Sequence, residues 1–132
     1  MNTEIKTVEQ AFSFLGKDIN ALPDVSMIDE KSRQAILSHY KLIVVAEALN
    51  KEANGGETWT PDWDNMDQRK YYPWFEISKE DKGSGFGFSC TDYDYGYTDT
   101  IVGSRLCFLS RELALYAAKQ FEQLYKDYFI IQ

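Results

Sequence analysis

Apolar residues recur at helical spacing in three parts of the chain, and each part carries a signal for the start of a helix. Thr7-Val8-Glu9-Gln10 has the form of a capping box and opens a short apolar stripe over residues 7–15. The longest stripe covers residues 26–51, where Ser26 is the expected N-cap. A third stripe covers residues 110–129 and begins at Ser110. The pattern therefore predicts three helices.

Between the second and third helices the apolar positions recur with period two, which is typical of β-strands. The sequence YYPWFEIS, residues 71–78, places Phe75 on one face and Tyr72 and Trp74 on the other. Pro73 has no N–H to donate, so we expect this segment to be an edge strand or a strand start. Such an edge can also pair across a dimer.

Two further strands complete the expected sheet. One passes through Phe86 and Phe88, and the other covers residues 101–109. We expect the first hairpin to set Phe75 opposite Phe88 and Ile77 opposite Phe86, which joins their apolar faces.

The element order α-α-β-β-β-α predicts an α+β fold, in which a three-stranded antiparallel meander over residues 71–109 packs with helices. The 132 residues are expected to form a single domain, 1–132. Residues 54–70 form a connection longer than most. We expect Trp59 and Trp63 to pin this loop to the rest of the molecule.

In the stretch GFGFSCTDYDYGYTDT, residues 85–100, the alternation of apolar and polar positions shifts by one residue near the middle. Up to Cys90 the apolar residues occupy even positions, and from Tyr93 onward the aromatic residues occupy odd positions. A one-residue shift of this kind predicts a β-bulge or the start of a turn near Thr91. We therefore interpret the first part as buried strand and residues 91–100 as an exposed tyrosine–aspartate hairpin end.

The charge of the chain disfavours nucleic-acid binding. The formal net charge is −7 and the pI is near 4.7, whereas nucleic-acid affinity comes mainly from Lys and Arg. Gly85-Phe86-Gly87-Phe88 resembles the centre of an RNP1 motif, but Ser84 stands where that motif needs Lys or Arg. A core hairpin strand explains the same residues.

The acidic residues of the same stretch resemble part of a calcium loop. Asp92 and Asp94 fit the first ligand positions of an EF-hand, but Gly96 and Gly103 occupy positions that need side-chain oxygens. A looser cation site formed by Asp92, Asp94 and Asp99 stays open beside the simpler interpretation, a solvated acidic tip.

The sequence offers few residues for catalysis or for binding a metal ion. Cys90 and Cys107 are too few for a disulfide framework or a structural zinc site, and His39 is the only imidazole. We predict no catalytic residue, no metal ligand and no cofactor. The chain begins without the features of a signal peptide, and no apolar run reaches the ~20 residues of a membrane span. We therefore expect a cytoplasmic protein that does not bind membranes.

Five distinctive stretches occur between about residue 45 and residue 129. They are ALN (48–50), TPDWDN (60–65), KYYPWFEI (70–77), GSRLCF (103–108) and ELALYAAKQFEQLYKDYF (112–129). Together they resemble an uncharacterised family of small proteins of gut Bacteroidetes, their phages and their mobile elements. That family has no assigned activity. The resemblance implies a bacterial or phage-infected host cell as the setting and assigns no functional residue.

A candidate binding surface combines aromatic and acidic residues of the loop and sheet with one arginine. Tyr and Trp give rigid contact area with a polar group, and they are frequent in interface hot spots. Alternatively, a helix or the long loop covers these residues and makes them a second small core. The candidates are Trp59, Trp63, Tyr72, Trp74, Asp92, Tyr93, Asp94, Tyr95, Tyr97, Asp99 and Arg105.

Three functional hypotheses follow. The first is a non-enzymatic protein, associated with a phage or mobile element, that binds a protein partner through this surface. The second is a small-ligand-binding protein with an aromatic-lined pocket between sheet and loop, where Arg105, Arg69 or Lys70 can meet an anionic group. The third is an acidic mimic of nucleic acid, which the spread of the acids among lysines disfavours. A flat aromatic patch favours the first hypothesis, and a concave pocket with convergent polar groups favours the second.

Overall fold

Four helices and two strands make up the part of the chain that the computed structural model describes, residues 1–65, 67–78, 87–96 and 103–131. For residues 76–78 and 87–96 only the backbone is described. In chain order the elements are α1 (Val8–Phe14), α2 (Glu30–Ala53), β1 (Lys70–Ser78), β2 (Gly87–Gly96), α3 (Arg111–Gln120) and α4 (Glu122–Phe129).

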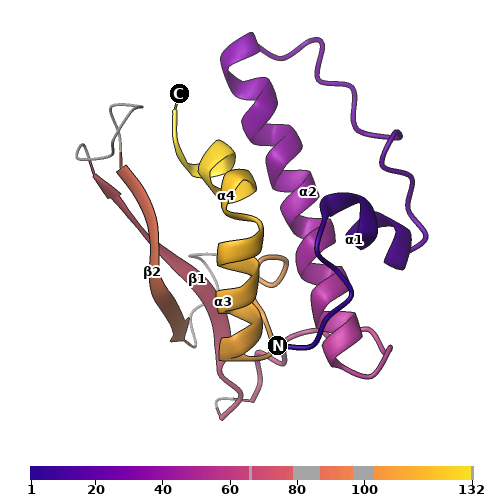
Figure 1. The fold of residues 1–132 in the computed structure, drawn as a ribbon, viewed down its shortest axis with the longest axis vertical. Coiled ribbons are helices and arrows are strands. Elements are labelled where there is room, and N and C mark those ends of the chain that lie inside the picture. The colour runs from indigo at the N-terminus through magenta and orange to yellow at the C-terminus, as the bar shows by residue number, and fades with distance from the viewer. Residues whose placement is uncertain (66, 79–86, 97–102, 132) are drawn as a thin grey trace.

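The elements form three layers (Figure 1). β1 and β2 lie on one side, α3 and α4 lie in the middle, and α2 with α1 lies on the other side. The core fills the space around the middle layer, where burying each large apolar side chain contributes about 1.5–3 kcal/mol. Its buried side chains include Phe12, Leu42, Val45, Leu49, Phe108, Leu113, Ala117 and Tyr125.

The expected three-stranded meander is wrong, because the sheet of the described residues has two strands, β1 and β2. Residues 103–109 form a turn and then a single bridge, in which Tyr71 and Phe108 exchange backbone hydrogen bonds of 3.1 and 2.7 Å. Gly103 has a φ of 70°, which is left-handed rather than extended. The Asn50 side chain also bonds the backbone of Cys107 and Leu109, so these groups are not used in a strand ladder.

The register of the hairpin also differs from expectation. Phe75 pairs with Cys90 and Ile77 pairs with Phe88, which is two residues away from the expected register. A shift of two keeps the alternation of faces, since side chains repeat with period two. The alternating pattern therefore predicts correctly which residues share a face. It does not predict the register, because the sequence between the two strands contains no turn motif of fixed length.

The expected bulge near Thr91 is confirmed. The register changes between Trp74, which pairs with Asp92, and Phe75, which pairs with Cys90, so Thr91 is the extra residue. The interpretation of residues 91–100 as a hairpin end is wrong for residues 91–96, which continue β2. The bulge absorbs the change of frame, and pairing then resumes as far as Lys70 and Gly96.

Pro73 fits β1 because of the direction in which its backbone faces. Tyr71 directs its N–H and C=O toward Phe108 rather than toward β2. Pro73 lies two residues further on and faces the same outer edge, so the ladder with β2 needs no N–H from it.

The start of α1 agrees with expectation, whereas the start of α2 does not. The capping box of α1 is present, with Gln10 N–H donating to Thr7 Oγ1 and Thr7 N–H donating to Gln10 Oε1, both at 3.1 Å. Ser26 does not cap α2, which begins after Asp29. The Ser26 N–H instead donates to Asp24 Oδ1 at 2.9 Å, within a turn that precedes the helix.

The single helix expected over residues 110–129 is divided at Phe121. Ser110 caps α3, as expected, by accepting a hydrogen bond from Leu113 N–H at 3.2 Å. Phe121, with a φ of −115° and a ψ of 30°, leaves helical geometry and separates α3 from α4. Phe121 and Tyr125 are both buried, so the break occurs where the chain stays in the core.

Candidate functional site

A groove of about 630 Å³ opens between α2, the loop that follows it and the turn before α3. One face of α2 supplies His39, Ile43, Glu47 and Asn50, which recur every three or four residues. The other walls are residues 58–61 of the Trp loop (residues 54–69) and residues 103–106 of the turn. Three segments that lie far apart in the sequence therefore form one concave surface.

The groove combines one large aromatic side chain with several polar groups. Trp59 is half-buried in the loop wall, Arg105 is exposed in the turn wall, and Glu47 is exposed on α2. Within the described residues, the charged groups of Glu47 and Arg105 make no hydrogen bond or ion pair. His39 stacks on Tyr128 of α4, with ring centroids 4.6 Å apart and planes 18° apart. These groups are available to a bound molecule.

Asn50 lines the groove and bonds two backbone groups just beyond the opposite wall. Its Nδ2 donates to the carbonyl of Cys107 at 2.9 Å, and its Oδ1 accepts from Leu109 N–H at 3.0 Å. The side chain is only 4% exposed. Asn50 therefore joins α2 to the segment after the turn, and burial leaves little of it for a ligand.

Lys70 holds the Trp loop from inside, although it is a charged residue and only 3% exposed. Its Nζ donates to three backbone carbonyls, those of Asp62 at 2.6 Å, Asn65 at 3.1 Å and Gln68 at 2.8 Å. An ammonium group has three donors, so all of them are satisfied. The Nζ also lies 5.1 Å from the centre of the Trp63 ring, at cation–π distance.

Cys107 lies behind the turn wall and is not suited to nucleophilic chemistry. It is a free, buried thiol whose Sγ lies 3.6 Å from the carbonyl oxygen of Ser104, to which it donates. Burial raises the pKa of this thiol to about 11, against a smaller opposing effect from a backbone hydrogen bond and from the charge of Lys70. The thiol therefore stays protonated near neutral pH, and the thiolate is the reactive form.

The residues expected to form one surface lie in two separate places. Trp59 and Arg105 line the groove, and Trp63 lies behind it, where its Nε1 donates to Ser104 Oγ at 3.0 Å. Tyr72 and Trp74 belong to the face of β1 opposite Phe75, and Trp74 is 48% exposed there. Of the two alternatives for these residues, an exposed surface or a covered second core, the 48% exposure of Trp74 favours the first at this position.

The backbone register locates the acidic and tyrosine candidates of β2. Trp74 pairs with Asp92 and Tyr72 pairs with Asp94, while Tyr93 pairs with Pro73 and Tyr95 pairs with Tyr71. The acids, rather than the tyrosines, are therefore the register partners of Tyr72 and Trp74. Tyr97 and Asp99 lie outside the described residues, so the alternative of a cation site at Asp92, Asp94 and Asp99 is not tested.

Sequence reasoning did not assign two contributors to the site, His39 and Glu47, although the spacing of residues 39, 43, 47 and 50 is a signal for one shared face. Lys70 is one of three cations considered for an anionic ligand, but the structure encloses it within the loop. A buried lysine without a carboxylate partner leaves no mark in a sequence, because its ligands are backbone carbonyls.

Comparisons of the chain with protein-family models, curated proteins and solved structures found no match. The resemblance to the Bacteroidetes and phage family therefore stays a prediction. Within the described residues, no helix has the length and apolar character needed to cross a membrane. The same part of the chain contains no group of three or more His, Cys, Asp or Glu side chains placed to hold a metal ion.

Proposed function

We propose that the protein binds a small, flat ligand carrying an anionic group in the groove between α2, the Trp loop and the turn. The observation that carries this proposal is the convergence of Trp59, Glu47 and Arg105 on one concave surface, with the charged groups unpaired among the described residues. A volume of about 630 Å³ lies within the usual range of ligand pockets.

Each wall of the groove suits one part of such a ligand. A flat ring can stack on Trp59, because offset stacking adds to the gain from burying aromatic area. A carboxylate, sulfonate or phosphate can meet the planar guanidinium of Arg105 through two parallel hydrogen bonds. Glu47 can accept from a donor on the opposite side of the ligand. The proposal is of binding without reaction.

Binding of anilinonaphthalene sulfonate, a flat aromatic anion, tests the proposal. The dye is titrated into the wild type, Arg105→Gln, Trp59→Ala and the control Lys119→Gln, which removes an equal charge from the exposed face of α3. We expect saturable binding that each variant weakens by about tenfold. Arg105→Gln loses a charge-assisted hydrogen bond, and Trp59→Ala loses ring stacking and buried aromatic area. The control should bind like the wild type. Equal affinity in all four proteins would place the dye elsewhere and contradict the proposal.

A second candidate function, binding of a protein partner, is favoured by a different observation. Trp74 is 48% exposed on the face of β1 that points away from the core. Tryptophan is the residue most enriched in interface hot spots. The association with a phage or mobile element and the cytoplasmic setting belong to this candidate and rest on the family resemblance, while the free thiol of Cys107 agrees with a reducing compartment.

A further inference from the structure

The Trp loop is built around the ammonium group of Lys70. Three carbonyls converge on Nζ, and the loop adds its own bonds, since Gln68 Oε1 accepts from Asp62 N–H at 2.7 Å. Side chains of Asp62 and Asn65 accept from backbone N–H groups two residues further on, at 3.0 and 2.9 Å. A buried charge is tolerated only when its donors are fully satisfied, so the loop and Lys70 determine each other's conformation.

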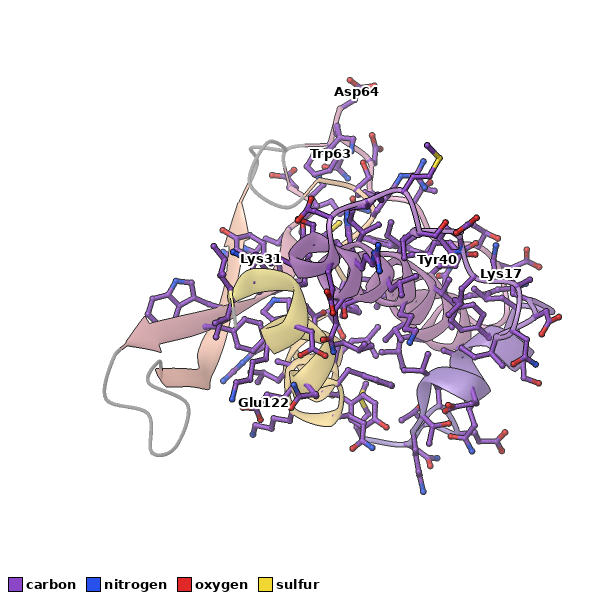
Figure 2. The ribbon with its side chains drawn as sticks, turned by 90° about the horizontal axis from the view of Figure 1, so that it is seen from above. Lys17, Lys31, Tyr40, Trp63, Asp64 and Glu122 are labelled. Carbon is purple, nitrogen blue, oxygen red and sulfur yellow. The ribbon has the colours of Figure 1, made fainter. Side chains whose placement is uncertain are left out.

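Trp63 connects this loop to the opposite wall of the groove. One side of its ring faces Lys70 Nζ at 5.1 Å, and its Nε1 donates to Ser104 Oγ at 3.0 Å. Ser104 belongs to the turn that lines the groove, whereas Trp63 and Lys70 do not line it. Figure 2 shows Trp63 at one edge of the molecule, well away from Lys17.

We propose that Lys70 and Trp63 are positioning residues that set the spacing between the loop wall and the turn wall of the groove. Lys70 bonds the carbonyls of three loop residues that follow the loop wall, Asp62, Asn65 and Gln68. Trp63 joins the same part of the loop to Ser104, so these contacts connect the two walls. The consequence for ligand binding rests on the proposed function, but the positioning itself can be measured without any ligand.

Because the ammonium group of Lys70 holds the loop, a small free ammonium ion should rescue a variant that lacks it. Lys70→Ala removes three methylene groups and the ammonium, so all three carbonyls lose a charge-assisted hydrogen bond. The carbonyls of Asp62 and Asn65 keep one backbone donor each, at 3.3 and 3.2 Å, whereas the Gln68 carbonyl loses the donor that Lys70 gave it. Free propylammonium has the shape and charge of the missing part and can bind in the emptied site. Propanol lacks the charge, and tetramethylammonium lacks the N–H donors, so neither can replace it.

Hydrogen–deuterium exchange of the full chain tests the proposal in peptides covering residues 58–68 and 103–109, which contain the hydrogen-bonded N–H groups of Gln68 and Phe108. The variants are Lys70→Ala, Trp63→Phe and the control Lys17→Ala, which removes an exposed lysine. Trp63→Phe keeps an aromatic ring and loses the bond to Ser104. We expect exchange about tenfold faster in both peptides for Lys70→Ala and Trp63→Phe, and no change for the control. Propylammonium should restore slow exchange in Lys70→Ala only.

Two results would overturn the positioning role. One is unchanged exchange at residues 103–109 in Trp63→Phe, a variant that keeps an aromatic ring beside Lys70 and loses the bond to Ser104. The other is a failure of propylammonium to restore slow exchange in folded Lys70→Ala. Absence of groove binding by anilinonaphthalene sulfonate in the wild type would instead reject the proposed function. Where the dye binds, its affinity should fall about fivefold in Trp63→Phe, the effect of one hydrogen bond.

Discussion

Asn50 acts as a substitute for a neighbouring strand. Its carboxamide has one donor and one acceptor side, like a peptide group, and it bonds the Cys107 carbonyl and the Leu109 N–H at 2.9 and 3.0 Å. A third strand would direct these groups to a partner strand. The buried amide therefore joins the segment before α3 to α2, and within the described residues that segment forms one bridge with β1, at Phe108.

Asn50→Ala should lower the free energy of unfolding by about 2–4 kcal/mol, because it leaves a buried carbonyl and a buried N–H unsatisfied. Asn20→Ala is the matched control, since Asn20 is exposed and such surface changes alter stability by about 0.5 kcal/mol or less. Urea unfolding of both variants and the wild type provides the measurement. Similar values for Asn50→Ala and Asn20→Ala would show that the amide bonds contribute little.

Cys107 predicts a pH dependence of stability. Burial raises its pKa from 9.0 to about 11, so the folded state holds the thiol proton more tightly than the unfolded state. The resulting stabilisation is fully present below pH 9 and is lost as the pH rises toward 11. We expect the free energy of unfolding of the wild type, relative to Cys107→Ala, to decrease between pH 8.5 and pH 10.5. A constant difference in unfolding free energy between the two proteins across that range would contradict the raised pKa of Cys107.

At the scale of elements, local signals were readable from the sequence and long-range pairings were not. The caps at Thr7 and Ser110 each depend on residues three positions apart, and the bulge at Thr91 depends on a change of frame. The absent third strand depends on Asn50, which is 57 residues from its partner Cys107. No periodicity reports such a contact, so the meander was the simplest expectation and was wrong.

The two N-caps that precede α2 and α3 provide a comparison within one chain. Ser110 accepts a hydrogen bond from Leu113 N–H, whereas the Asp29 side chain makes no cap bond. Ser110→Ala should therefore cost about 1 kcal/mol of unfolding free energy. Asp29→Ala should cost only a few tenths, because it removes a negative charge near the N-terminus of α2 and one exposed hydrogen bond, donated by Ser32 Oγ to Asp29 Oδ2 at 2.9 Å. Thermal and urea unfolding measure the loss of unfolding free energy in each variant. A loss in Asp29→Ala that equals or exceeds the loss in Ser110→Ala would contradict this prediction.

At the scale of the whole molecule, the candidate site was predictable in its residue types but not in its location. Trp59 and Arg105 were named because aromatic and guanidinium groups serve in binding, and both line the groove. His39 and Glu47 join them because three layers bring α2 beside the segments that flank the sheet (Figure 1). That arrangement depends on the packing of α3 and α4 between them, which no local pattern contains.

The two candidate functions occupy different parts of the molecule, so two substitutions should separate them. Arg105 lines the groove, and Trp74 lies on the outward face of β1. Arg105→Gln should weaken binding of anilinonaphthalene sulfonate about tenfold and leave capture of protein partners unchanged. Trp74→Ala should abolish specific capture from a bacterial lysate, because losing a hot-spot tryptophan costs about 2 kcal/mol or more, and it should leave dye affinity unchanged.

Quantitative mass spectrometry of the captured proteins and fluorescence titration of the dye measure the two effects, with circular dichroism to show that both variants fold. Loss of dye binding without any Trp74-dependent capture favours the small ligand, and the reverse result favours a protein partner. A loss of both activities in each folded variant would mean that the groove and the sheet face act as one site.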